Sequence, residues 1–311
     1  MGIAHFDTAG SHEFESGHLR GRWTFLGVAA GALGTALRRV ELPPGGWSTP
    51  VHEHGSAEEI FYVLGGHGLA WQDGRATEIV AGDCIAHLPR RGAHTMHALE
   101  SLDVVVFGPR VRTESPRFPR LGLSLLGSGA VDTVAAILDG TPLHFLREGE
   151  LGPPELPTER GPRPANIINL AEVKPESRSR SPAARIRRDL GGAAGSSACR
   201  LYHIEVAPGM ESAPAHCHSV EEEIVVVLAG EGTVELGDEK TAVVAGHVIA
   251  RPPGTGVAHA FRAGEPGLTY LEFGTRELSD LCYYPHSRRI AFPGIRVIAT
   301  LEHIEHWNGE E

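Results

Sequence analysis

A pattern of histidine, glutamate and glycine occurs twice in this chain of 311 residues. Its shared members are two histidines separated by one residue, a glutamate five positions later and two glycines: His52, His54, Glu59, Gly66 and Gly68, then His216, His218, Glu223, Gly230 and Gly232. Each residue of the first copy precedes its counterpart by 164 positions, and this register runs from residues 26–27 to Gly82. Single-residue insertions then pair His94 with His259 and Phe107 with Phe273. A repeat of roughly a hundred residues has the length of a domain, so the chain is a duplication of one domain.

Short apolar runs separated by glycine, proline and aspartate predict an all-β sandwich or barrel for each copy. Such turn residues stand at positions 43–46, 65–66, 73–74 and 81–83. Jelly-roll barrels have this rhythm of short strands. We expect a first domain at 1–108, a proline-rich connection with a short helix from Val131 to Gly140 at 109–164, and a second domain with a C-terminal tail at 165–311.

The repeated histidines and glutamates predict a metal site in each domain. Alternate residues of a strand share a face, so both histidines of each pair point the same way. Three imidazoles and a carboxylate are costly to bury in an apolar barrel without a metal or mutual hydrogen bonds. This donor set suits divalent Fe, Mn, Ni, Cu or Zn. We therefore expect one divalent transition metal per domain, with the ligands His52, His54, Glu59 and His94 in the first and His216, His218, Glu223 and His259 in the second.

The same alternation predicts what surrounds each metal. The inward-facing neighbours of the ligands are Phe61, Val63 and Met96 in the first copy, and Val225, Val227 and Phe261 in the second. These side chains predict a small, apolar and dry substrate pocket. Three carboxylates close in sequence to the ligands are interpreted as solvated: Glu58, Glu221 and Glu222. Five arginines that open the second copy are interpreted as a solvated face, with an anion site as the alternative: Arg178, Arg180, Arg185, Arg187 and Arg188.

These motifs resemble those of the cupin superfamily, and the whole chain resembles a bicupin. The first cupin motif is matched by Gly46, His52, His54, Glu59 and Gly66, and in the second copy by His216, His218, Glu223 and Gly230, with Met210 in place of the leading glycine. The second motif is matched by Gly246, Pro252, Gly254 and His259, and more loosely by Gly82, Pro89, Gly92 and His94. The motif's usual asparagine is replaced by Ala98 and Ala263. The resemblance implies tandem double-stranded β-helix barrels with metal sites.

Three functions fit these features. The leading hypothesis is a metal-dependent oxidoreductase of the dioxygenase type that acts on a small organic substrate. The alternatives are a non-redox metal-dependent decarboxylase or isomerase, and a non-enzymatic small-molecule-binding bicupin. The second site has the tighter turn, at residues 251–254, and a smaller wall residue, Val225, where the first site has Phe61. These two differences predict that the second site is the more reactive one.

Composition narrows the partners. A net charge of −11 argues against nucleic acid, and no apolar run approaches the roughly 20 residues of a membrane span. The N-terminus lacks the pattern of a signal peptide, and the four cysteines form no CxxC pair. We expect a cytoplasmic protein that is a monomer with a pseudo-dimeric architecture, or a homodimer, and that binds a small-molecule substrate.

Overall fold

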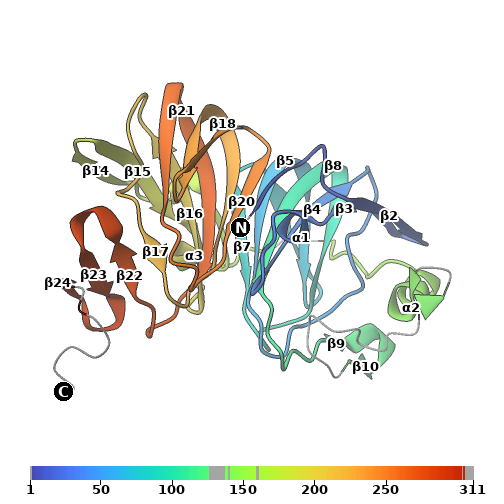
Figure 1. Cartoon of the computed structure of the whole chain (residues 1–311). Coiled ribbons are helices and arrows are strands. Elements are labelled where there is room, and N and C mark those ends of the chain that lie inside the picture. Colours follow the sequence, from blue (N-terminus) through green and yellow to red (C-terminus); the bar gives the residue numbers. More distant parts are fainter. Residues whose placement is uncertain (1, 126–136, 139–140, 159–160, 303, 305–311) are drawn as a thin grey trace, which may run out of the picture.

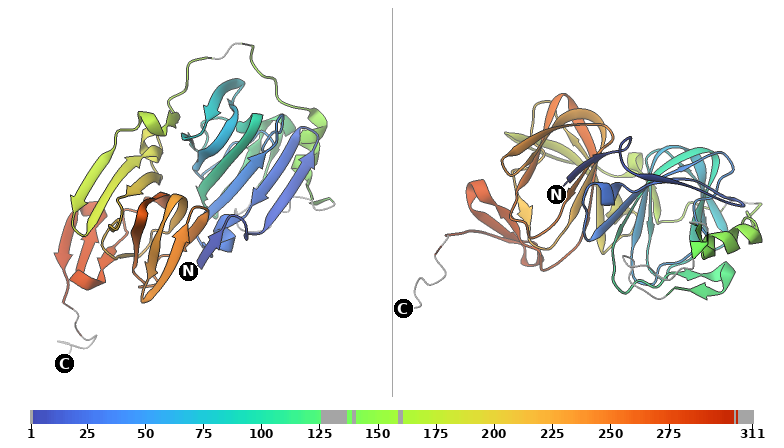
Figure 2. Two further views of the ribbon diagram at one scale, coloured as in Figure 1. Left: turned by 90° about the horizontal axis from the view of Figure 1, so that it is seen from above. Right: turned by 45° about the vertical axis from the view of Figure 1, so that its right-hand side comes forward.

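The computed structural model describes residues 2–125, 137–138, 141–158, 161–302 and 304. It contains two β-barrel domains that lie side by side, each built on an eight-stranded antiparallel sheet (Figure 1; Figure 2, left). This confirms the all-β architecture of two tandem jelly-roll barrels.

The first barrel has the strand order β13-β7-β5-β8-β4-β3-β2, and β6 pairs with β5. Its elements are β2 (Ser11–Ser16), β3 (Leu19–Thr24), α1 (Leu26–Ala29), β4 (Thr35–Leu42), β5 (Glu59–Gln72), β6 (Arg75–Val80), β7 (Asp83–His87), β8 (His94–Pro109) and β13 (Ile167–Asn169). The long strands β5 and β8 pair along most of their length and form the centre of the barrel.

The second barrel repeats this plan with the order β1-β20-β18-β21-β16-β15-β14, and β19 pairs with β18. Its elements are β1 (Gly2–His5), β14 (Glu176–Arg180), β15 (Ala183–Asp189), α3 (Leu190–Ala193), β16 (Cys199–Val206), β18 (Glu223–Leu236), β19 (Glu239–Val244), β20 (His247–Arg251) and β21 (His259–Thr275). Strands β18 and β21 take the places of β5 and β8.

The repeated glycines Gly66 and Gly230 lie where the two central strands of each barrel bend. The β5–β8 and β18–β21 ladders both shift register around these positions. Both glycines have positive φ values, +87° and +78°. A Cβ atom there would collide with the main-chain oxygen of Ser101 in the first barrel or of Gly267 in the second. Glycine is required at this position because other residues are strained in that conformation and have no space for a side chain.

Successive side chains along the central strands point into two different cores. One set of side chains fills each barrel, with Val63 and Met96 in the first and Val227 and Phe261 in the second. The opposite set forms a shared core between the domains. The duplicated residues Phe107 and Phe273 meet there, with ring centroids 5.1 Å apart and planes 15° apart. The two domains therefore pack through equivalent faces.

Each domain also takes one strand from the sequence assigned to the other. Strand β1 pairs with β20 of the second barrel, beside which the N-terminus is marked in Figure 1, and β13 pairs with β7 of the first. The expected division at 108 and 165 differs from this pairing, because residues 2–5 belong to the second sheet and residues 167–169 to the first. Local sequence patterns indicate a strand but not its partner.

The connection and the tail carry short elements. They are β9 (Arg117–Phe118), η1 (Pro119–Leu121), β10 (Leu123–Ser124), β11 (Ile137–Leu138), β12 (Thr141–Pro142), α2 (Leu143–Leu151), η2 (Leu170–Glu172), β17 (Cys217–His218), β22 (Cys282–Tyr284), η3 (Pro285–Ser287), β23 (Arg289–Phe292), η4 (Pro293–Ile295) and β24 (Val297–Thr300). The helix expected from Val131 to Gly140 lies outside the described residues, except for β11, which is a strand. In the tail, β22, β23 and β24 form a small sheet with β17. Among the helices of the described segments, none has the length and apolar character needed to cross a membrane.

Candidate metal centres

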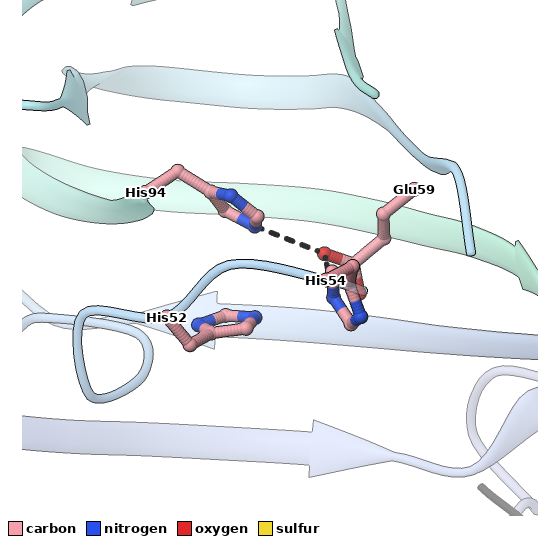
Figure 3. Close-up of side chains that lie close together, drawn as sticks. All are labelled: His52, His54, Glu59 and His94. Atoms are coloured by element: carbon pink, nitrogen blue, oxygen red, sulfur yellow. Dashed lines mark hydrogen bonds and ion pairs between the residues drawn. The ribbon is translucent and has the colours of Figure 1, made fainter. Parts of the chain in front are cut away.

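The first cluster lies where three segments of the first barrel meet. Two main-chain hydrogen bonds of 3.2 and 2.8 Å join His52 to His94 at the start of β8. Glu59 opens β5, which pairs with β8, so its carboxylate points toward the same space as the histidines (Figure 3). Ligand atoms of His52, His54, Glu59 and His94 all lie within 4.8 Å of one another. The structure therefore brings together the four residues that the sequence singled out in the first copy.

Local contacts orient the His52 ring. Its Nδ1 lies 2.9 Å from the main-chain oxygen of Pro50. A neutral imidazole that donates from Nδ1 presents the lone pair of Nε2, which is the metal-binding form. Burial, together with His94 and His54, lowers the pKa of His52 to about 3, so the ring is neutral at physiological pH.

His54 lies between two carboxylates. Its Nε2 is 3.3 Å from Oε2 of Glu59, and its Nδ1 is 3.5 Å from Oε1 of Glu114. Burial opposes a charge on His54, but these carboxylates raise its pKa to about 10. Burial also opposes charge on Glu59, yet His54 and His94 hold its pKa well below the usual value. Without a metal, an imidazolium thus balances Glu59, and metal binding must displace that proton.

The second cluster repeats this arrangement with His216, His218, Glu223 and His259, whose ligand atoms also lie within 4.8 Å of one another. His216 is joined to His259 by main-chain hydrogen bonds of 3.1 and 2.9 Å. The His216 Nδ1 lies 2.8 Å from the main-chain oxygen of Pro214, which leaves Nε2 free. Burial lowers the pKa of His216 to about 4. The imidazole geometry is thus the same in both copies.

The second histidine of each cluster also faces a carboxylate that the sequence motifs do not include. Asp280 Oδ2 lies 2.6 Å from Nδ1 of His218, as Glu114 does more loosely at His54. Both carboxylates also accept main-chain N–H groups of the loop that follows the histidine. They are counterparts at the same offset as Phe107 and Phe273, so the duplication register carried the signal. Such carboxylates fix the tautomer and orientation of a metal-binding histidine.

The two clusters differ in the cross-strand neighbour of the glutamate. Glu59 is paired with His87 in the β5–β7 ladder, whereas Glu223 is paired with Arg251 in the β18–β20 ladder. The His87 ring stacks on His94, with centroids 3.6 Å apart and planes 9° apart. Arg251 instead places Nη2 2.8 Å from Oε2 of Glu223.

A second guanidinium reaches the other oxygen of Glu223. Arg200 Nη2 donates to Oε1 at 2.8 Å, and Arg200 also pairs with Glu221. Burial opposes charge on Glu223, but Arg251, His218 and Arg200 hold its pKa well below the usual value. The counterpart of Arg200 in the first copy is Ala36, which carries no charge.

The first cluster fits a divalent metal. His54 Nε2 is buried and has no hydrogen-bond partner, and the ring nitrogens converge on Glu59, whose ion pairs among the described residues are with histidines. The second cluster offers the same donors, and the Nε2 atoms of His218 and His259 are likewise buried without a partner. However, two guanidinium groups already contact its carboxylate.

A cavity adjoins each cluster. The first, of about 200 Å³, is lined by His54, Glu59, Arg38 and Arg110, among others. The second, of about 250 Å³, reaches all four residues of its cluster and is lined by four arginines: Arg185, Arg187, Arg200 and Arg251. The expectation of a small apolar pocket is therefore wrong for the second domain. The interpretation of Arg185 and Arg187 as part of a solvated face is wrong for the same reason.

The predicted pocket residues are mostly core. Phe261 lines the second cavity. The other five, namely Phe61, Val63, Met96, Val225 and Val227, are buried in the two barrel cores and line neither cavity. Strand alternation correctly turned them inward, but the space beside the metal ligands opens toward other strands.

The three carboxylates interpreted as solvated are buried. Glu58, Glu221 and Glu222 are 4, 6 and 3% exposed. Glu58 and Glu222 accept hydrogen bonds from the opposite domain, and Glu221 pairs with Arg200. The interpretation was wrong because their partners lie far away in the sequence.

Comparison with known proteins agrees with this fold and these motifs. The cupin domain family matches residues 38–107 and residues 202–270, one region in each barrel. The chain is a bicupin. No curated protein sequence matches it significantly.

Solved structures of similar fold include two bacterial oxalate decarboxylases. One is the Bacillus subtilis enzyme, which contains Mn(II) centres. It has 16% identity and a TM-score of 0.57, and the match covers 90% of this chain and 78% of that chain. Another is the Lactobacillus farciminis enzyme in a formate complex, with 16% identity, a TM-score of 0.57, and coverage of 89% and 87%. At this identity the likeness establishes the fold.

Proposed function

We propose that this bicupin is a metal-dependent enzyme that performs a non-redox reaction, of the decarboxylase or isomerase type, on a small carboxylic acid bound at the first cluster. The observation that carries the proposal is the first cavity. It brings the candidate ligands His54 and Glu59 into one space with the guanidinium groups of Arg38 and Arg110.

The two arginines are available for a substrate. Within the described part of the chain, no carboxylate lies within ion-pair distance of Arg38 or Arg110. A guanidinium binds a carboxylate through two parallel hydrogen bonds, so such a pair selects a carboxylic acid. The size of the cavity, about 200 Å³, suits a small molecule.

Other residues of the site have defined tasks. His52, His54, Glu59 and His94 would hold the metal, which supplies a Lewis acid that polarises a substrate oxygen. Glu114 holds His54 by its Nδ1 atom. Val106, Phe107 and Pro109 form an apolar wall of the cavity and keep water from the substrate. The likeness to manganese-containing oxalate decarboxylases makes manganese the first metal to test.

The decisive experiment separates non-redox chemistry from the dioxygenase reaction that the same donor set also supports. Protein loaded with Mn(II) is incubated with ¹³C-labelled small mono- and dicarboxylic acids, including oxalate, and oxygen and carbon dioxide are both measured. We expect product without net oxygen consumption. Oxygen uptake in proportion to product would contradict the proposal and favour a dioxygenase.

Variants connect the activity to the site. Substitution of both His52 and His54 by alanine should abolish turnover together with metal binding at the first cluster. Arg38→Ala and Arg110→Ala should each raise KM about tenfold or more, because each removes a charge-assisted contact with the carboxylate. Arg112→Ala is the matched control, since Arg112 is exposed and lies outside the cavity. Unchanged KM in both arginine variants would contradict the assignment of the substrate site.

A further inference from the structure

Arg251 brings a positive charge to the candidate ligand carboxylate of the second cluster. Its side chain is 4% exposed, and Nη2 lies 2.8 Å from Oε2 of Glu223. The same oxygen faces Nε2 of His218 at 3.5 Å and Nε2 of His259 at 3.4 Å. A permanent positive charge therefore lies beside the carboxylate oxygen that the imidazoles surround.

The guanidinium groups in contact with Glu223 oppose a divalent metal in the second cluster. Glu223 contacts a guanidinium through each oxygen, with Arg251 on Oε2 and Arg200 on Oε1. A carboxylate neutralised in this way attracts a metal less strongly, and the metal would also be repelled by the nearby arginines. In the first cluster the corresponding residues are His87 and Ala36, and among the described residues the ion pairs of Glu59 are with histidines, so its carboxylate is not held by a guanidinium.

The donors of Arg251 are not used up by Glu223. Both Nε and Nη2 are buried and have no partner in hydrogen-bond geometry, so the contacts of Nη2 with Glu223 and, at 3.7 Å, with Oε2 of Glu272 are ion pairs only. Buried donors without an acceptor are costly, which points to a ligand. Nε and Nη2 form one edge of the planar guanidinium, and this edge matches the two oxygens of a carboxylate.

The surroundings provide space and further charge for such a ligand. The cavity next to Arg251 has a volume of about 250 Å³. Arg185 also lines it, is half-buried, and has no ion-pair partner among the residues that the structure describes. Arg187, on the same strand, is held by Glu176 and lies over the Tyr202 ring. Within the described segments Arg185 is thus free of an ion pair, and Arg251 has donors outside hydrogen-bond geometry, so these two arginines are the candidates to bind an anion.

We propose that the second cavity is a binding site for a small carboxylate-bearing ligand and not a second metal centre. Arg251 replaces the divalent ion as the cationic partner of Glu223, and its Nε–Nη2 edge binds the carboxylate. The assignment of the metal to the first cluster alone rests on the proposed function, whereas the anion site does not. This arrangement reverses the ranking of the two sites that turn shape and wall size predict.

Metal content tests the first half of the proposal. Protein is saturated with Zn(II) or Mn(II), desalted, and analysed for metal per chain. We expect one equivalent in the wild type, none after the His52/His54 double substitution to alanine, and an unchanged value after the same substitution of His216 and His218. Arg251→His, which installs the residue of the first copy, should raise the content to two. Two equivalents in the wild type, halved by substitution of His216 and His218, would overturn the proposal.

Ligand binding tests the second half. The Arg38→Ala/Arg110→Ala protein serves as the background, so that binding at the first cavity is removed, and calorimetry measures its affinity for malonate and inorganic phosphate. In this background Arg251→Lys, which keeps the charge but lacks the planar edge, should weaken malonate binding at least tenfold. Arg188→Lys, outside the cavity, is the matched control, and circular dichroism confirms folding of each variant. Equal malonate affinity in the Arg251→Lys protein, or tighter binding of phosphate than of malonate, would overturn the carboxylate assignment.

The two halves fail separately. If the wild-type protein retains no metal, the proposed function fails, and malonate binding still tests the anion site in the second cavity. If the first cluster binds metal and Arg251→Lys leaves malonate binding unchanged, the proposed function stands and the anion site is wrong.

Discussion

Glu58 and Glu222 cross the interface between the two barrels in opposite directions. Glu58 accepts main-chain N–H groups of residues 198–199 at 3.1 Å, and Glu222 accepts those of residues 33–34 at 2.7 and 2.8 Å. The two glutamates are counterparts in the duplication. Each domain therefore satisfies polar groups of the other, and the interface depends on both copies keeping this residue.

Removal of Glu58 should destabilise the protein. Glu58→Ala leaves the N–H groups of Ala198 and Cys199 and the Ser196 hydroxyl without their carboxylate acceptor. Buried donors without a partner cost about 1–3 kcal/mol each, so we expect a loss of about 2–4 kcal/mol in the free energy of unfolding. Urea unfolding followed by tryptophan fluorescence measures it. Glu265→Ala is the control because Glu265 is exposed, and equal stability of the two variants would refute the role of Glu58.

The same carboxylate predicts how stability depends on pH. Burial raises the pKa of Glu58, but hydrogen bonds from Ser196, Ala198 and Ser197 bring it below the usual value of 4.5. The unfolded chain then binds the proton more readily, so this stabilisation is complete above pH 4.5 and is lost as the pH falls through the folded-state pKa. The unfolding free energy of the wild type should fall more steeply than that of Glu58→Gln between about pH 5 and pH 3. Parallel curves would show that Glu58 does not titrate in this way.

The carboxylates behind the second histidines should affect metal binding unequally. Glu114→Gln weakens the hold on Nδ1 of His54 while keeping one oxygen for the loop, and loss of such a contact lowers metal affinity about 10–100-fold. Asp280→Asn makes the equivalent change at His218 and should leave the tight metal site unaffected, because we assign that site to the first cluster. Competition with a chromophoric chelator measures both affinities. A larger effect of Asp280→Asn would assign the tight site to the second cluster.

The N-terminal strand should protect the edge of the second barrel. Residues 2–5 pair with residues 247–250 of β20, so deletion of residues 1–7 exposes the main-chain groups of that strand. Hydrogen–deuterium exchange of β20 should then become much faster, by an order of magnitude or more. The equivalent strand β7 is covered by β13 and provides the internal control. Unchanged exchange of β20 after the deletion would contradict this role of β1.

Much of the architecture was readable because it is encoded in local spacing. The separation of His52 from His54 places both on one face of a strand, and Gly66 stands where the main chain comes too close for a side chain. The duplication doubles each signal, so the all-β fold and the convergence of both four-residue clusters could be predicted. The pairing of β1 with the second sheet and of β13 with the first could not be predicted, because the sequence of a short strand does not identify the strand that it pairs with.

The sequence by itself determined the duplication, the barrel fold and the eight residues that form two equivalent clusters, since these depend on periodicity within each copy. Only the tertiary structure decided how the clusters differ. Strand pairing sets Arg251 beside Glu223 and His87 beside Glu59, and barrel closure brings Arg200 to the same carboxylate. Electrostatic attraction depends on distance in space, so we propose that the same set of donors forms a metal site in one barrel and an anion site in the other.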